Sequence, residues 1–151
     1  MPFHRILLAG ALSLTLGGQV LAQQSDLLGS WTAEATTLLE AEEKLTETPR
    51  ELTFVHTLVI EAVDGQLVSG YRTWERQTDL PPGYIGDVPL NVAREPFIGT
   101  VSSDGKTIRL VETEDEGLIF CERIGADRIE LTYMEAAPHA LIFTAILERA
   151  Q

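Results

Sequence analysis

Residues 52–77, LTFVHTLVIEAVDGQLVSGYRTWERQ, contain the strongest strand and turn signals of the sequence. Two runs rich in β-branched and aromatic residues flank Asp64-Gly65, and such a pair between strand-like runs is a strong hairpin signal because both residues tolerate positive φ. In the second run Val68, Gly70 and Arg72 share one face and alternate with residues of the other, as along a strand. The stretch therefore predicts two antiparallel strands joined by a tight turn.

The same features recur along the rest of the chain. Turn residues at 103–105 and 125–127 each separate two further strand-like runs. Eight strands in up-and-down order tend to close, because closure removes the exposed edges of the sheet. We therefore expect an all-β fold, an eight-stranded antiparallel up-and-down β-barrel, with an interior that is filled by side chains or holds one small ligand. The expected strands are Gly29–Thr37, Leu52–Val63, Gln66–Gln77, Glu95–Ser102, Lys106–Thr113, Gly117–Ile124, Arg128–Met134 and Ala140–Glu148.

Two segments interrupt this pattern. Thr37-Leu38-Leu39-Glu40 has the spacing of a capping box, so residues 37–48 are expected to form a short helix or ordered lid between the first two strands. Residues 79–94 contain three prolines and are too long for a hairpin turn, so they form either a functional loop or a simple insertion. We expect both segments to surround one end of the barrel.

The first 22 residues have the layout of a secretory signal peptide. A short basic start precedes an apolar run at residues 6–16, and Val20-Leu21-Ala22 places a small residue just before an expected cleavage ahead of Gln23. The run is too short to span a bilayer, which takes about 20 apolar residues, and no later run is long enough. We expect a signal peptide at 1–22, one domain at 23–151, and a periplasmic or secreted protein; the alternative is an uncleaved anchor.

Composition excludes several classes of function. The 151 residues contain 11 Lys+Arg and 23 Asp+Glu, a formal charge of −12, and so acidic a surface repels nucleic acid. The hydrophobic share of 44% excludes a disordered chain, and a single cysteine excludes a disulfide scaffold. No nucleophile, metalloprotease or phosphate-binding motif occurs. We therefore expect no enzyme and no cofactor.

A few side chains are candidates for function, each beside a structural interpretation. Arg72 is either an outward charge or an anion-binding group at the end of the barrel, and Cys121 is expected to be a buried small hydrophobe. His56 and His139 lack neighbouring ligands at metal-binding spacing, so no metal site is expected. Four aromatic residues either form the wall of a ligand cavity or simply fill the interior: Tyr71, Phe97, Tyr133 and Phe143. One acidic cluster is expected to be a solvated hairpin tip rather than a calcium site: Glu112, Glu114, Asp115 and Glu116.

The two ends of the expected barrel carry a family resemblance. Leu28-Gly29-Ser30-Trp31 opens the first strand and Leu147-Glu148-Arg149 closes the last, which resembles the Gly-x-Trp start and near-terminal Arg of lipocalin-like (calycin superfamily) barrels. Residues 95–100 and 103–108 also resemble segments of uncharacterised bacterial lipocalin-like proteins. The resemblance implies that Trp31 plugs one end of the barrel with Arg149 across its indole ring, and that the barrel binds a small apolar ligand.

Two functions of different classes follow. The first is an exported barrel that binds a small apolar or amphipathic molecule, which we expect to be neutral or cationic because Glu40, Glu42, Glu43 and Glu47 of the lid repel anions. The second is a protein-interaction module. It resembles exported inhibitors of secreted proteases, in which a short N-terminal trunk enters the protease cleft, and Gln23–Asp26 would be that trunk.

Overall fold

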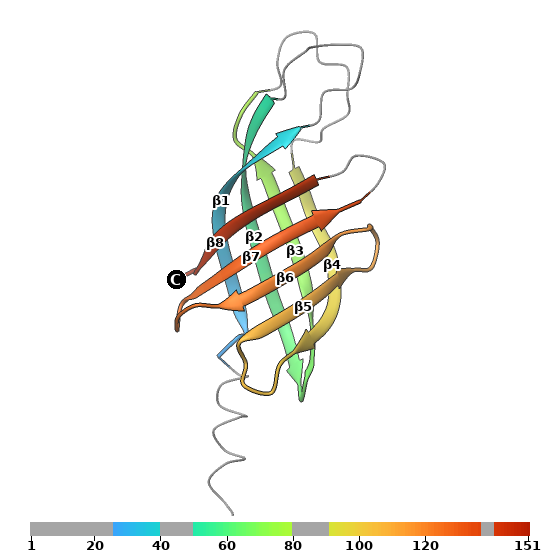
Figure 1. Cartoon of the computed structure of the whole chain (residues 1–151), viewed down its shortest axis with the longest axis vertical. Coiled ribbons are helices and arrows are strands. Elements are labelled where there is room, and N and C mark those ends of the chain that lie inside the picture. Colours follow the sequence, from blue (N-terminus) through green and yellow to red (C-terminus); the bar gives the residue numbers. More distant parts are fainter. Residues whose placement is uncertain (1–25, 40–49, 80–90, 137–140) are drawn as a thin grey trace, which may run out of the picture.

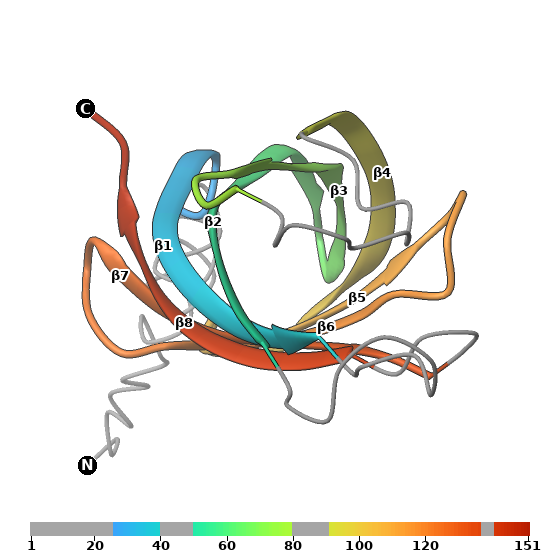
Figure 2. The same ribbon diagram turned by 90° about the horizontal axis from the view of Figure 1, so that it is seen from above.

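The computed structural model describes residues 26–39, 50–79, 91–136 and 141–151 (Figure 1). Eight antiparallel strands in this part of the chain form a closed barrel in sequence order, so the predicted fold class is confirmed. Figure 2 shows the ring of strands seen along the barrel. The strands are β1 (Gly29–Leu39), β2 (Arg50–Asp64), β3 (Leu67–Arg76), β4 (Asn91–Val101), β5 (Thr107–Glu112), β6 (Leu118–Arg123), β7 (Arg128–Glu135) and β8 (Leu141–Arg149).

The hairpin that predicts the fold is present, but its two turn residues are Gly65 and Gln66, one position later than expected, because Asp64 is the last residue of β2. Leu67 pairs with Asp64, and Gly65 has φ of 58°, a conformation that glycine adopts without steric cost. The ring closes where β1 meets β8, through the register pairs Trp31 with Arg149 and Thr32 with Glu148. Every strand therefore has a partner on both sides, and the barrel has no free sheet edge among these strands.

Alternation along the strands separates the interior from the outer wall. In β5, Ile108, Leu110 and Glu112 are buried while the residues between them are more exposed, and the same period of two runs through the other strands. The buried hydrophobic side chains form one core inside the barrel. Burying a large aliphatic or aromatic side chain contributes about 1.5–3 kcal/mol, so this core is the main source of stability.

One end of the barrel is sealed around Trp31, and we call it the tryptophan end. Trp31 is fully buried, its indole N–H donates to the Leu27 carbonyl at 3.0 Å, and the Arg149 guanidinium lies 4.1 Å from the ring centroid. Arg149 also donates to the backbone carbonyls of Asp26 and Leu28 and to the Asp127 carboxylate. The residues named by the family resemblance therefore hold the start of β1, the end of β8 and the β6–β7 turn together.

The opposite end, at which β1, β3, β5 and β7 finish, is called the loop end. Strand β1 continues to Leu39, so the first three residues of the expected helix at 37–48 are strand, and residues 40–48 lie outside the described part. Strand β4 begins at Asn91, four residues before its expected start, because the β3–β4 pairing extends to Asn91. The expected signal peptide and most of the 79–94 loop also lie outside the described residues. No helix among the described residues is long and apolar enough to cross a membrane.

Candidate functional site

Polar and charged side chains enter the barrel interior in the half nearest the loop end. Arg72 of β3 and Glu112 of β5 are 4% and 3% exposed, and Glu95 of β4 is 14% exposed at its side chain. Tyr133 of β7 is fully buried beside them. The register aligns Arg72 with Glu95 across β3–β4, so neighbouring inward positions bring the opposite charges together.

Arg72 is the centre of this buried network. Its Nε donates to Glu112 at 2.7 Å, a second guanidinium nitrogen donates to Glu95, and the guanidinium carbon lies 4.2 Å from the Tyr133 ring centroid. A buried charge is tolerated only when it is paired and hydrogen-bonded, and here two carboxylates and an aromatic face supply those contacts. The expectation of an outward Arg72 is therefore wrong, because Arg72 lies on the same inward face as Val68 and Gly70. Its guanidinium binds two carboxylates of the protein itself, and binding of a further anion stays a prediction.

Burial raises the pKa values of two carboxyl groups of this network, Glu95 and Glu135. Burial raises the pKa of Glu95 to about 7, and hydrogen bonding to Glu112 adds to the rise against the pull of Arg72. The Tyr133 hydroxyl lies 3.1 Å from Glu112 and 3.0 Å from Glu135. A phenol has one proton, so the second contact needs a proton on a carboxyl group, in agreement with the raised pKa of half-buried Glu135.

Gly117 makes room for the Glu112 carboxylate. A Cβ atom at this glycine would lie 1.8 Å from Glu112 Oε2 and 2.7 Å from the Tyr133 hydroxyl. The expected solvated acidic tip is therefore wrong for Glu112, which turns inward, whereas Glu114, Asp115 and Glu116 are exposed as expected.

His56 of β2 is buried next to this network without a polar contact. It is 5% exposed, and neither ring nitrogen has a hydrogen-bond partner among the described residues. Burial, assisted by the positive charge of Arg72, lowers the pKa of His56 to about 3, so the imidazole is neutral near pH 7. A neutral imidazole presents one donor and one acceptor. His56 therefore brings two unused hydrogen-bonding atoms to the interior.

Aromatic rings surround His56. Its ring stacks on Phe143 with 4.3 Å between centroids, and Phe143 in turn lies 5.3 Å from Tyr133. Phe54 lies 5.9 Å from His56 on one side and 5.3 Å from Trp74 on the other, where the two rings meet edge to face. The interior of the loop-end half thus combines flat apolar surfaces with a few polar groups, which is the usual make-up of a small-molecule site.

The predicted cavity-wall residues are only partly brought together. Tyr133 and Phe143 lie in this group, and Phe97 is fully buried in the interior and pairs in register with Gly70 and Glu112. Tyr71 is not part of the wall, because it occupies the outward face of β3, where the exposed Arg94 lies 4.0 Å from its ring centroid.

Several residues of the site were missed at the level of sequence. The sequence pattern considers His56 only as a metal ligand, and it does not single out Glu95 or Glu135. The alternation itself contained the information, because His56 shares a face with Phe54 and Leu58 along its strand. Cys121 is buried as expected, and burial raises the pKa of its thiol to about 12, so it is unreactive.

Two further findings concern metals and relatives. In the described ranges, no group of three or more His, Cys, Asp or Glu side chains is placed to hold a metal ion. No protein-family model matches the sequence, and no curated protein matches it. Of the expected inhibitor trunk, only Asp26 lies in the described part.

Proposed function

We propose that the protein is an exported barrel that binds a small amphipathic molecule, neutral or cationic, in the loop-end half of its interior. The observation that carries the proposal is His56, a buried imidazole with neither nitrogen partnered among the described residues. Buried polar groups in folded proteins are nearly always hydrogen-bonded, and an exception calls for a specific reason. A ligand that supplies a donor or an acceptor to His56 is such a reason.

The surroundings of His56 limit the chemistry of the ligand. Phe54, Trp74 and Phe143 offer ring faces and edges to an apolar or aromatic portion. Arg72 already binds two carboxyl groups of the network, Glu95 and Glu112, so an anionic ligand at this guanidinium would lie next to both of them. A neutral molecule with a hydroxyl or amide group fits His56 directly, and a cationic group fits nearer the carboxyl groups of the network.

Glu95 and Glu135 are the carboxyl groups that reach furthest toward solvent. The Glu95 side chain is 14% exposed and Glu135 is half-buried at the end of β7, whereas Glu112 is enclosed. These two residues are therefore the acceptors that a donor group on a ligand would meet first. Burial raises the pKa of Glu95 to about 7, so near pH 7 this group is partly protonated and also donates to a carbonyl or hydroxyl oxygen.

Native mass spectrometry tests the proposal. Purified protein is measured before and after extraction with organic solvent, and we expect a co-purifying molecule that extraction removes and re-addition restores. The His56→Phe variant removes the two hydrogen-bonding atoms and should retain less of that molecule. Val55→Thr is the matched control, because Val55 is next to His56 on the opposite face of the same strand. A protein that carries no small molecule and takes up none from an extract of its host contradicts the proposal.

A further inference from the structure

The outer wall of the barrel carries a row of apolar side chains, one from each of five consecutive strands. The register pairs Ile98 of β4 with Val111 of β5, Val111 with Leu118 of β6, Leu118 with Met134 of β7, and Met134 with Ile142 of β8. We call these five residues the apolar row. Ile142 and Ile98 are 65% and 60% exposed, Val111 and Leu118 are 50% and 40% exposed, and Met134 is half-buried.

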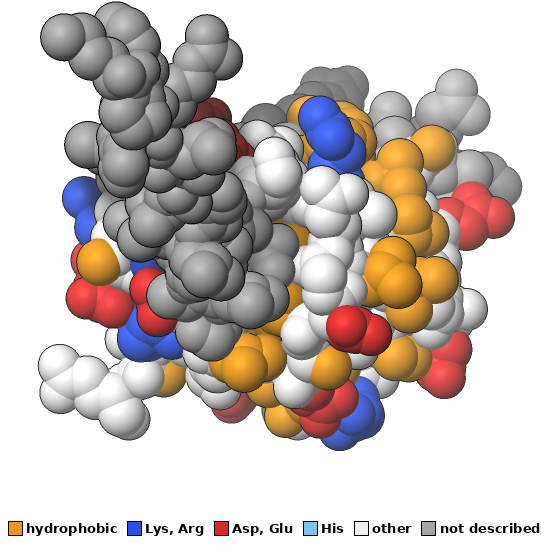
Figure 3. Space-filling model, turned by 90° about the horizontal axis from the view of Figure 1, so that it is seen from below, with side chains coloured by type: hydrophobic (Ala, Val, Ile, Leu, Met, Phe, Trp, Pro, Cys, Tyr) orange, Lys and Arg blue, Asp and Glu red, His pale blue; other side chains and the backbone are white. Residues whose placement is uncertain are grey.

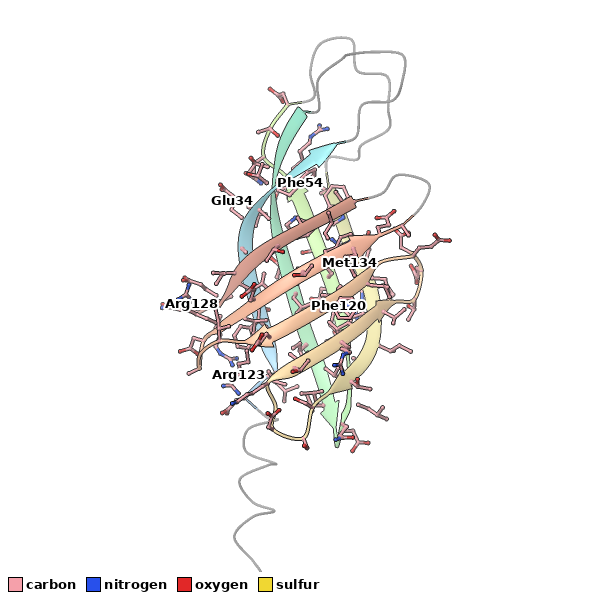
Figure 4. All side chains as sticks on the ribbon, viewed as in Figure 1. Glu34, Phe54, Phe120, Arg123, Arg128 and Met134 are labelled. Atoms are coloured by element: carbon pink, nitrogen blue, oxygen red, sulfur yellow. The ribbon has the colours of Figure 1, made fainter. Side chains whose placement is uncertain are left out.

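The row continues toward the tryptophan end through Phe120. Phe120 is 41% exposed and lies two residues beyond Leu118 on the same face of β6. Figure 4 shows Met134 and Phe120 on the wall formed by β5 to β8. Large contiguous apolar patches on a soluble protein mark interaction sites, whereas single exposed hydrophobic residues need no explanation. Directly paired residues across five strands form a patch of the first kind.

Backbone pairing is not available to a partner on this wall. Each strand from β4 to β8 is hydrogen-bonded to a neighbour on both sides, so a partner cannot add a strand there. A partner must instead cover side chains. Strand β8 offers such side chains, because Ile142 and Ile146 are exposed on its outer face while Phe143, Ala145 and Leu147 fill the interior.

Acidic groups border the apolar row on both sides. Toward the loop end, the β5–β6 turn follows Val111 and precedes Leu118, and it exposes Glu114, Asp115 and Glu116. Toward the tryptophan end, Glu122 and Glu130 face each other in the β6–β7 register, and both are exposed. Like charges directly opposite each other destabilise a sheet, so a cation brought by a partner would relieve this pair.

The charges near the apolar row can be set beside those of the face seen from below. There, Figure 3 shows hydrophobic side chains gathered over part of the face, with acidic and basic side chains scattered around them. On the wall of the apolar row the basic group between the two acidic borders is Arg109, which is paired in register with Phe120. A second copy of the chain would place the same acidic borders against each other, and each copy carries a formal charge of −12.

We propose that the apolar row is a docking surface for a segment of another protein that carries apolar side chains flanked by lysine or arginine. The apolar centre supplies the area removed from water, and the acidic borders steer the basic flanks and fix the register of the partner. This surface lies outside the barrel and does not depend on a ligand in the interior, so either proposal can fail without the other.

A synthetic amphipathic peptide with leucine on one face and lysine on the other tests the surface. When this peptide is added, the backbone amide NMR signals of residues in β5 to β8 around the apolar row should shift, or their amides should exchange more slowly with solvent. The same peptide with glutamate in place of lysine should bind at least about tenfold more weakly, a difference of about 1.4 kcal/mol. The Glu122→Gln, Glu130→Gln double variant should weaken binding of the lysine peptide and reduce its sensitivity to salt.

Variants of the row separate docking from general attraction to an acidic protein. Leu118→Ser with Ile142→Ser should weaken the lysine peptide about tenfold. The control is Ile124→Ser, because Ile124 is 44% exposed but lies in the β6–β7 turn at the tryptophan end. Equal binding of the lysine peptide by the Leu118→Ser, Ile142→Ser variant and by the Ile124→Ser control overturns the proposal. So does concentration-dependent dimerisation that the double variant abolishes, or binding of the row to phosphatidylcholine vesicles without binding to the peptide.

Discussion

Replacing His56 with phenylalanine should stabilise the protein, and the gain should grow as the pH falls. The substitution keeps a ring against Phe143, which stacks on the imidazole at 4.3 Å, and removes two polar atoms that have no partner among the described residues. An unpaired buried polar group costs about 1–3 kcal/mol, so the free energy of unfolding should rise by about that much near pH 7.5.

The pH dependence provides the sharper test, because it does not depend on how well the new side chain packs. The pKa of His56 is lowered from 6.5 to about 3 by burial and by Arg72. In the unfolded chain the imidazole takes up a proton below about pH 6.5, whereas in the folded protein it stays neutral until about pH 3. The wild-type protein therefore loses stability as the pH falls through this window. At about pH 5 the pH lies about 1.5 units below the pKa of His56 in the unfolded chain, so the free energy of unfolding has fallen by about 2 kcal/mol.

The assay is urea unfolding followed by tryptophan fluorescence at several pH values. His56→Phe has no imidazole to protonate, so it does not lose this stability at low pH. The difference in unfolding free energy between His56→Phe and wild type should therefore increase by about 2 kcal/mol between pH 7.5 and pH 5. The His56→Leu variant is measured in parallel, because the phenylalanine ring is larger than imidazole and overpacking costs about 1–3 kcal/mol. Other groups titrate in both proteins and cancel in the difference. A stability difference that is independent of pH in both variants would contradict the lowered pKa of His56.

Four further outcomes follow from the fold and the network. Trp31→Ala should cost about 3–5 kcal/mol of unfolding free energy in urea titration, and a loss under about 1 kcal/mol would show that Trp31 does not seal its end. Arg72→Met should cost about 3–5 kcal/mol because it leaves buried carboxylates unpaired, and adding Glu112→Gln should recover part of that loss; a simple sum of the two single losses argues against coupling. Gly117→Ala should lower the melting temperature by displacing the Glu112 carboxylate, which thermal unfolding monitors, and an unchanged melting temperature contradicts the close contact. Burial raises the pKa of Glu95, so the folded state binds this proton more tightly, and the protein loses stability as the pH rises from about 4.5 through about 7. Glu95→Gln should remove this loss of stability, and a pH profile of unfolding free energy that stays the same in the variant argues against the raised pKa.

The architecture follows from the sequence because its determinants are local. Alternation, the Asp64-Gly65 turn signal and the regular spacing of strand-like runs each act over a few residues, and they predict strand order and closure correctly. The helix boundary predicted at residue 37 is wrong, because the pairing of β1 with β2 extends to Leu39 and Arg50 and keeps residues 37–39 in the strand. Long-range pairing prevails over a short helix motif there.

The candidate site is less accessible from sequence, because it depends on partners far apart in the chain. Arg72 and Glu112 are 40 residues apart, and each alone resembles a solvated surface charge. Only the register shows that both face inward and that Glu95 joins them. A charged residue on the apolar face of an alternating strand is the feature that would have identified Arg72, since lone charges are rarely buried without partners.

Nitrogen-15 NMR of the imidazole ring tests whether His56 contacts a small molecule bound in the barrel interior. Spectra are compared for protein as purified and after organic extraction, with the His56 signals assigned by their absence in His56→Phe. We expect extraction to change the His56 nitrogen shifts and re-addition of the extracted molecule to restore them. Nitrogen shifts that stay the same while mass spectrometry shows the molecule bound and then removed would contradict a contact with His56.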